Sequence, residues 1–385
     1  MQRRFFIAGG LGVGGLLAAG PGWARQADAS VKEIAVPVRL MNNRVLVDVT
    51  LNGTGPLSFV IDTGGMLSGV KQDLATRLNL KAQRFVRLNG AHFPLYEVGE
   101  VVYGGAIRQP RVALFGVTSS MALGGDGLLA AGVVTAMDSR LEFENGIWRV
   151  FPDGAPPLPD GYQRLRSELT TNTEGLSLIP YADIAVSGRT QRALWDTGGP
   201  RPLSIHREAA RGLGLLDPSV PYAPIPFSGI QGRLSENGRM VRVSSITVGE
   251  HTYENVLAAI HPANTPRHYD VLLGLPIIQT LDMAFDRASK SFAIRRNGLA
   301  VGSEPHYSRS GIWMEVARGR VRVADVGTGS PAALAGVQVG DILDGVSTLE
   351  DGVRLLAGPE GQAKELRLTR AGQSVTARFE LKAYL

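Results

Sequence analysis

Two short aspartate motifs are the residues of this chain whose types and spacing could carry chemistry. The tetrapeptide Asp-Thr-Gly-Gly occurs at residues 62–65 and again at residues 196–199, each time directly after an apolar, strand-like segment. If the two turns meet, the carboxyls of Asp62 and Asp196 face each other, and like charges about 3 Å apart cannot both ionise. The pair then shares one proton, so its ionised member can deprotonate water while its protonated member donates to a substrate carbonyl.

The residues beside the two aspartates suit such a pair. Thr63 and Thr197 can hydrogen-bond between the two turns and prevent the carboxylates from rotating. Gly64 and Gly198 permit tight turns and let backbone N–H groups approach the carboxylates closely. The competing interpretation is that both motifs are structural turns inherited by duplication. The predicted chemistry needs no metal, no cofactor and no nucleophilic side chain.

An internal repeat surrounds the motifs. Residues 60–65 match residues 194–199, and further along residues 126–142 match residues 270–286 at a constant offset of 144. Two matched sets in the same order indicate two related halves that arose by duplication. A pseudo-twofold packing of these halves would bring the two aspartate turns together.

Each half also predicts a similar order of strands and one helix. Apolar or alternating runs favour strands, and apolar residues spaced four apart favour a helix after each motif. The predicted strands are residues 34–40, 44–51, 57–61, 182–186 and 191–195, and the predicted helices are residues 71–80 and 206–215. The predicted division is a first lobe at 30–151, a Pro-rich linker at 152–160, a second lobe at 161–297 and a third domain at 305–385.

The unit of strand, Asp-Thr-Gly and helix, followed by an apolar-apolar-Gly segment, resembles the pepsin and retropepsin-like aspartic protease family over roughly residues 31–297. In the second half, Val-Leu-Leu-Gly at 271–274 matches the family signature. Two copies in one chain resemble the bilobal form, in which a single chain supplies both catalytic aspartates, here Asp62 and Asp196. The resemblance implies all-β lobes and hydrolysis of peptide bonds by an activated water, with a hairpin flap closing over an extended substrate.

Candidate flaps follow from position between the matched segments. They lie at residues 90–96 and 227–234, and within them we name His92, Phe93, Phe227 and Gly229.

Other interpretations stay open. The sequence departs from the family at Ala130, where the family has Gly, at Gly65 and Gly199, where it prefers Ser, Thr or Ala, and at Trp195, which is bulky before a catalytic Asp. A non-catalytic periplasmic adaptor whose degenerate lobes bind extended peptides is therefore an alternative. A pair of aspartates made by homodimerisation of like lobes is another, although we expect a monomer.

The last part of the chain resembles a bacterial PDZ domain over about residues 308–385, with its most specific match at 329–343. PDZ domains bind an extended peptide as an added strand and hold its C-terminal carboxylate in a backbone nest. The resemblance implies a pairing strand at 313–316 and a groove helix at 349–356. The candidate peptide-binding residues are Ser310, Gly311, Ile312 and Trp313. Protein C-termini are thus expected partners, beside protein or peptide substrates.

Composition and the first residues limit the remaining possibilities. Arg3-Arg4, a short Gly-rich apolar stretch and Ala27-Asp28-Ala29 predict a twin-arginine-like export signal at 1–29, and hence a periplasmic or secreted protein without stable membrane insertion. The chain has no Cys, which excludes disulfides and thiol catalysis. Its net charge of +5 comes from scattered Arg, so we expect no nucleic-acid partner. The predicted fold class is mainly β: two retropepsin-like acid-protease β lobes plus a C-terminal PDZ domain.

Overall fold

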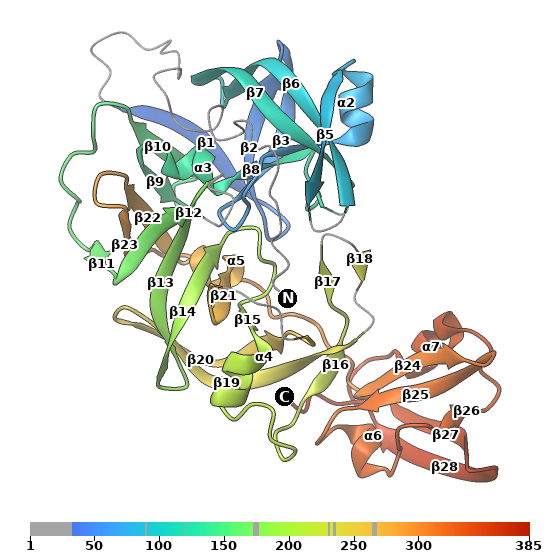
Figure 1. Ribbon diagram of the computed structural model, residues 1–385. Coiled ribbons are helices and arrows are strands. Elements are labelled where there is room, and N and C mark those ends of the chain that lie inside the picture. The colour runs from blue at the N-terminus through green and yellow to red at the C-terminus, as the bar shows by residue number, and fades with distance from the viewer. Residues whose placement is uncertain are drawn as a thin grey trace, which may run out of the picture. The chain divides into compact units, whose positions relative to one another are not determined.

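The structure is a computed structural model that describes residues 33–88, 91–119, 121–171, 177–229, 232–233, 236–263 and 268–385 (Figure 1). It is mainly β, as predicted. The predicted export signal at 1–29 lies outside the described residues. None of the helices in the described part combines the length and the apolar character needed to cross a membrane.

The chain divides into two compact units that cut across the predicted lobe boundaries. The first unit comprises Met1–Asp183, Arg192–Pro200 and Leu272–Gly302, and the second comprises Ile184–Gln191, Arg201–Val271 and Ser303–Leu385. The segment predicted as a second lobe therefore contributes to both units. Both aspartate motifs lie in the first unit.

Strands dominate the first unit. They are β1 (Ile34–Leu40), β2 (Val45–Leu51), β3 (Thr54–Asp62), β4 (Gly69–Lys71), β5 (Ala82–Leu88), β6 (Ala91–Tyr103), β7 (Ile107–Val117), β8 (Gly127–Ala130), β9 (Asp138–Glu142), β10 (Ile147–Phe151), β11 (Gln163–Arg164), β12 (Ser167–Thr171), β22 (Leu281–Asp286) and β23 (Ser291–Arg296). The helices are α2 (Gln72–Arg77), α3 (Ala131–Thr135) and α5 (Leu275–Ile278). Three strands have ends in both units: β13 (Leu178–Val186), β14 (Arg189–Asp196) and β21 (Val271–Gly274).

One sheet of 13 strands organises the first unit, in the order β11-β23-β22-β9-β10-β1-β2-β3-β8-β4-β7-β6-β5. Strand β2 also pairs with β6, so part of the sheet closes on itself. The alternating sequence of β2 explains its position, because Val45, Val47, Val49 and Leu51 are all buried on one face. In the same sheet β3 and β8 run parallel, with Asp62 opposite Ala130.

The pairing of β9 with β22 is symmetric with respect to the sequence repeat. In this antiparallel pair Ser139 lies opposite Phe285, and Leu141 lies opposite Met283. Ser139 corresponds to Met283, and Leu141 to Phe285, at the repeat offset of 144. Exchanging the two copies therefore maps each pair onto the other, so a local twofold relation exists inside the first unit.

Two backbone-to-carboxylate hydrogen bonds repeat this symmetry. The Phe143 N–H donates to Asp282 Oδ1 over 3.0 Å, and the Arg287 N–H donates to Asp138 Oδ1 over 2.8 Å. Each donor and each acceptor corresponds to its counterpart at the same offset of 144. The duplication visible in the sequence is thus preserved in contacts that tie the two copies together.

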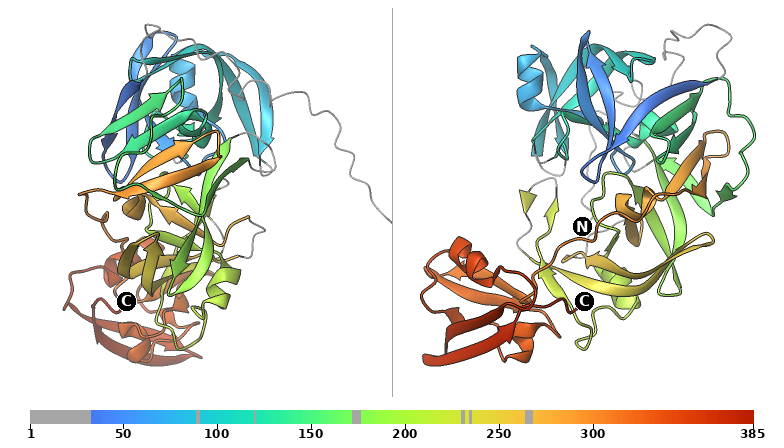
Figure 2. Two further views of the ribbon diagram at one scale, coloured as in Figure 1. Left: turned by 90° about the vertical axis from the view of Figure 1, so that its left-hand side faces the viewer. Right: turned by 180° about the vertical axis from the view of Figure 1, so that it is seen from behind.

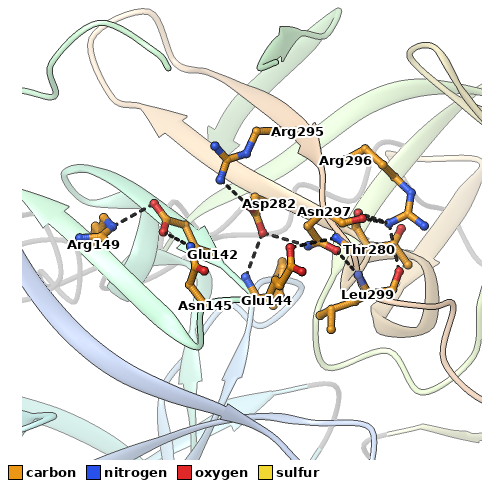
Figure 3. A network of polar contacts seen from close by, with 12 residues as sticks. Glu142, Glu144, Asn145, Arg149, Thr280, Asp282, Arg295, Arg296, Asn297 and Leu299 are labelled. Atoms are coloured by element: carbon orange, nitrogen blue, oxygen red, sulfur yellow. Dashed lines mark hydrogen bonds and ion pairs between the residues drawn. The ribbon is translucent and has the colours of Figure 1, made fainter. Parts of the chain in front are cut away.

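Asp282 is the buried centre of a larger polar network that joins β9 and β10 to β22 and β23 (Figure 3). Besides the Phe143 N–H, it accepts from Arg295 Nη2 over 2.8 Å and from Asn297 Nδ2 over 2.9 Å. Beside it, Arg149 Nε donates to Glu142 over 2.9 Å. A buried carboxylate is tolerated where such partners satisfy it, so Asp282 fixes how the matched strands meet.

The second unit contains a strand layer followed by a small five-stranded domain. Its elements are β15 (Leu203–Ile205), α4 (Arg207–Gly212), β16 (Ala223–Ile225), β17 (Ser228–Gly229), β18 (Gly232–Arg233), β19 (Gly238–Val248), β20 (His251–Ile260), β24 (Ile312–Ala317), β25 (Arg320–Val326), α6 (Pro331–Leu334), β26 (Ile342–Leu343), α7 (Leu349–Leu356), β27 (Ala363–Arg370) and β28 (Gln373–Glu380). Strands β15, β20, β19 and β16 are neighbours in that order. Strands β24 to β28 form the separate sheet, which is coloured orange to red in Figures 1 and 2.

The five-stranded domain packs firmly against β16 within the second unit. Tyr222 Oη donates to Asp325 Oδ1 over 2.8 Å, and Tyr384 Oη donates to the Tyr222 carbonyl over 3.1 Å. Gly327 approaches so closely that a Cβ there would lie 1.9 Å from the Tyr222 oxygen. Tyr307 and Tyr384 pack on an apolar cluster of this layer that includes Ile225. The domain and β16 therefore share one packed boundary.

The sequence predicted most strands well and the helices after each motif too long. Helix α2 ends at Arg77 rather than residue 80, because Asn79 has a positive φ of 53°. Helix α4 ends at Gly212, and Gly214 has a φ of 76°. Such left-handed residues terminate a helix, and apolar periodicity does not report them.

Candidate active site

Each aspartate motif forms a tight turn at the end of a strand. Asp62 ends β3 and Asp196 ends β14. The Gly65 N–H donates to the Asp62 carbonyl over 3.1 Å, and the Gly199 N–H donates to the Asp196 carbonyl over the same distance. The two turns thus have the same internal geometry.

Reciprocal hydrogen bonds join the two turns through their buried threonines. The Thr63 N–H donates to Thr197 Oγ1 over 3.1 Å, and the Thr197 N–H donates to Thr63 Oγ1 over 3.0 Å. Each hydroxyl then donates back to the opposite strand, Thr63 to the Trp195 carbonyl at 2.7 Å and Thr197 to the Ile61 carbonyl at 2.6 Å. These four bonds fix the two turns against each other, as the sequence analysis predicted for this pair of side chains.

The two carboxyls lie next to each other and share a hydrogen bond. The Gly64 N–H donates to Asp62 Oδ1 over 3.1 Å, and the Gly198 N–H donates to Asp196 Oδ1 over 2.8 Å. A Cβ on Gly64 would lie 2.5 Å from Asp196 Cγ, and one on Gly198 would lie 2.7 Å from Asp62 Cγ. Each glycine therefore packs against the carboxyl of the opposite motif, where a side chain has no room.

This arrangement makes the pair retain a proton. Burial raises the pKa of Asp62 well above its ordinary value, and repulsion from Asp196 and the hydrogen bond between the carboxyls add to that effect. Burial also raises the pKa of Asp196, but hydrogen bonds from Asp62 and from backbone N–H groups oppose the rise. Asp62 is thus the favoured location of the shared proton, and Asp196 is the favoured carboxylate.

The second matched segments hold both turns from behind. The Ala131 N–H, at the start of α3, donates to the Gly65 carbonyl over 3.0 Å. The Leu275 N–H, at the start of α5, donates to the Gly199 carbonyl over 3.0 Å. Because Ala131 and Leu275 correspond at the offset of 144, the two parts of the repeat build one symmetric site.

Comparison with known proteins agrees with this geometry over part of the chain. Residues 182–277 match the family model described as aspartyl protease. The matched range contains Asp196 and the Val271–Gly274 segment. Among curated proteins, none matches the chain.

Two solved structures illustrate what the chain is similar to in outline. A retropepsin-like aspartic protease from Rickettsia conorii shares 15% identity with a TM-score of 0.27, covering 35% of this chain and 91% of that one. Basic 7S globulin from soybean shares 10% identity with a TM-score of 0.40, covering 72% of this chain and 100% of that one.

Arg44 is a charged residue near the pair that the sequence analysis did not single out. It is half-buried, and its Nε and Nη1 donate to the carbonyls of Leu123 and Asn43 over 3.0 and 2.7 Å. Burial lowers the pKa of Arg44, while attraction to Asp196 and Asp62 acts in the opposite direction. The same attraction favours the ionised form of the carboxyls. Within the described residues, no group of three or more His, Asp or Glu is arranged to hold a metal ion.

We predict that Arg44→Met shifts the acid limb of the pH–rate profile upward by about one pH unit. Removing the positive charge raises the carboxyl pKa values, so the fully protonated, inactive pair persists to higher pH. The measurement is kcat/KM for one peptide across pH. Arg44→Lys keeps the charge and should preserve the profile. A superimposable profile for Arg44→Met would show that the guanidinium does not act on the pair.

We also predict that Gly64→Ala lowers kcat at least about 100-fold, because its methyl must displace the Asp196 carboxyl. Gly212→Ala is the matched control, since its Cβ would meet no atom within 4 Å. Steady-state kinetics on folded protein, checked by circular dichroism, test both variants. Full activity in Gly64→Ala would be incompatible with a rigid carboxyl pair.

The flap candidates fall in two different units. In the first unit, hairpin β5–β6 places His92 opposite Arg87 and Phe93 opposite Val86. His92 is exposed, but Phe93 is buried in an apolar cluster.

In the second unit, Phe227 is buried in the cluster that contains Ile225, and Gly229 pairs with Gly232 in hairpin β17–β18. Residues 89–90, 230–231 and 234–235, which include parts of both candidate segments, lie outside the described residues. Their role as flaps stays a prediction.

The candidate peptide-binding loop of the last domain is largely satisfied by its own groups. Ser310 is fully buried, and its Oγ accepts from the Ile312 N–H over 3.2 Å. The Gly311 N–H donates to the Ser308 carbonyl over 3.1 Å, and Gly311 has a φ of 77°. Trp313 lies next in chain on β24 and lines a groove. Carboxylate capture by this loop stays a prediction.

Proposed function

We propose that the chain is an aspartic endopeptidase in which Asp62 and Asp196 together activate water for peptide-bond hydrolysis. The observation that carries this proposal is the pair of hydrogen-bonded carboxyls with raised pKa values, held by reciprocal bonds between Thr63 and Thr197. The aspartyl protease match over residues 182–277 supports the same chemistry.

The geometry suggests a division of roles between the carboxyls. Asp196, the favoured carboxylate, takes a proton from water as the water oxygen attacks the substrate carbonyl carbon. Asp62, the favoured acid, gives its proton to the carbonyl oxygen, which yields a tetrahedral diol. The proton on Asp196 then passes to the amide nitrogen as the C–N bond breaks. A diol hydroxyl proton returns to Asp62, leaving a carboxylic acid and an amine.

We further propose that this peptidase is exported, acts as a monomer and uses its last domain to recruit polypeptides. The twin-arginine-like segment at 1–29 and the PDZ-like sequence at 329–343 support these two parts of the proposal. Both carboxyls of the pair come from one chain, which supports action as a monomer. Tethering a substrate at a second site would raise its effective concentration at the pair.

The test is hydrolysis of unfolded casein from acid to neutral pH, with and without a pepstatin-type inhibitor. We expect inhibitor-sensitive cleavage by the native chain and none by Asp196→Asn. A folded protein that binds casein-derived peptides without cleaving them would instead identify the non-catalytic adaptor.

A further inference from the structure

A large groove lies within the second unit, between the five-stranded domain and the layer that carries β16. Its volume is about 910 Å³. Apolar side chains of β24 and α7 form one wall, and residues around β16 form the other. The residues that matter for the argument are Trp313, Met314 and Val353 on the first wall and Ile225, Pro226 and Arg242 on the second.

Strand β24 offers an edge on which an extended chain can pair. Within the described residues, β24 hydrogen-bonds to β25 and to no second strand. Next to it, α7 leaves Val353 61% exposed, although an apolar side chain normally prefers burial. An added strand would satisfy the open backbone groups of β24 and cover this apolar surface at once.

The loop that precedes β24 does not present free donors for a terminal carboxylate. The N–H groups of Gly311 and Ile312 already donate to the Ser308 carbonyl and to Ser310 Oγ. A carboxylate at this position would have to break those bonds. Recognition through the strand edge, by contrast, does not require a chain end.

The charges along the groove favour an acidic side chain in the occupant. Arg309 lines the groove, is exposed, and forms no ion pair with any described residue. The second cation of the lining, Arg242, is already paired with Glu304 over 3.1 Å. One cation thus stays available for a partner carboxylate.

We propose that this groove binds an internal, extended and apolar segment of a polypeptide, with an acidic side chain next to Arg309. The site is composite: β24 pairs with the segment, while β16 and α7 enclose its side chains. This inference deepens the recruitment role proposed above and is independent of hydrolysis by Asp62 and Asp196.

The test uses the full chain with Asp62→Asn, so that no probe is cleaved. The probe is a fluorescent octapeptide of alternating valine and threonine with one glutamate, acetylated and amidated, and its binding is followed by anisotropy. We expect the amidated peptide to bind within about twofold of the same peptide with a free carboxylate. Exchanging its glutamate for glutamine should weaken binding about fivefold.

Matched variants locate the site. Val353→Asp should weaken binding at least about tenfold. Val339→Asp, on the same domain, should not, although Val339 is 64% exposed and thus comparable with Val353. Arg309→Glu should weaken binding about fivefold, whereas Arg320→Glu should leave it unchanged. Pro226→Glu, which places a negative charge on the second wall, should also weaken binding if the site is composite.

Several results would overturn the inference: no binding of the amidated peptide, a loss of more than tenfold on amidation, or equal effects of Val353→Asp and Val339→Asp. Unchanged binding in Pro226→Glu would remove the composite site. The native chain is assayed in parallel on casein. Failure to cleave casein with intact peptide binding would remove the proposed hydrolysis and leave this inference standing.

Discussion

Replacing Asp62 by Asn should abolish peptide hydrolysis, lowering kcat/KM about 10⁴-fold or more. The amide has no acidic proton for the substrate carbonyl, and the shared proton that makes Asp62 and Asp196 an acid–base pair is lost. Asn has nearly the same shape, so it can still accept from the Gly64 N–H. The measurement is kcat/KM on a peptide substrate at the pH of maximal activity.

The same substitution should not destabilise the protein at neutral pH. The pKa of Asp62 is raised in the folded state. Above the unfolded value of about 3.9, the folded state therefore binds more protons, and stability falls as pH rises towards the raised folded pKa. An uncharged Asn escapes this loss. Urea unfolding at neutral pH should give an equal or higher free energy of unfolding for Asp62→Asn than for the native chain.

The two measurements together decide the role of Asp62. Asp196→Asn should behave alike in hydrolysis, because either carboxyl alone cannot supply both acid and base. Full hydrolysis by Asp62→Asn would rule out the proposed mechanism. Loss of hydrolysis with a large loss of stability would instead mark Asp62 as a structural residue.

Asp282→Ala should lower the free energy of unfolding by about 3–5 kcal/mol. The side chain is 2% exposed and accepts three hydrogen bonds, so its removal leaves Arg295, Asn297 and the Phe143 N–H without their partner. Chemical unfolding followed by near-ultraviolet circular dichroism measures the change.

The exposed Asp160 provides the control for that experiment. Asp160→Ala should change the free energy of unfolding by less than about 0.5 kcal/mol. If Asp282→Ala matched this control, the network would not contribute to the stability of the first unit.

The carboxyl pair could be predicted from sequence because duplication copies positions as well as residues. The spacing of the two motifs relative to the second matched segments indicated that both turns belong to one symmetric site. The contribution of Arg44 could not be predicted, since its contact with Leu123 spans 79 residues and no sequence pattern marks it. Burial of Phe93 was likewise hidden, because alternation does not reveal which face of a hairpin packs inward.

The last domain gave a similar contrast. Its specific sequence at 329–343 predicted a strand and a helix that correspond to β24 and α7. Its packing against β16 could not be predicted, because the bond from Tyr222 to Asp325 joins residues 103 apart in the chain. Long-range contacts of this kind depend on the three-dimensional arrangement of elements, which local patterns do not encode.

The tight packing around Gly327 has a practical consequence for experiments on this protein. Deleting everything after residue 304 would strip Tyr307 and Tyr384 from the cluster around Ile225 and uncover its apolar surface. A shortened chain would then be prone to self-association, and its lost activity would say nothing about recruitment. Single substitutions that keep this surface covered are therefore the sound way to separate tethering from catalysis.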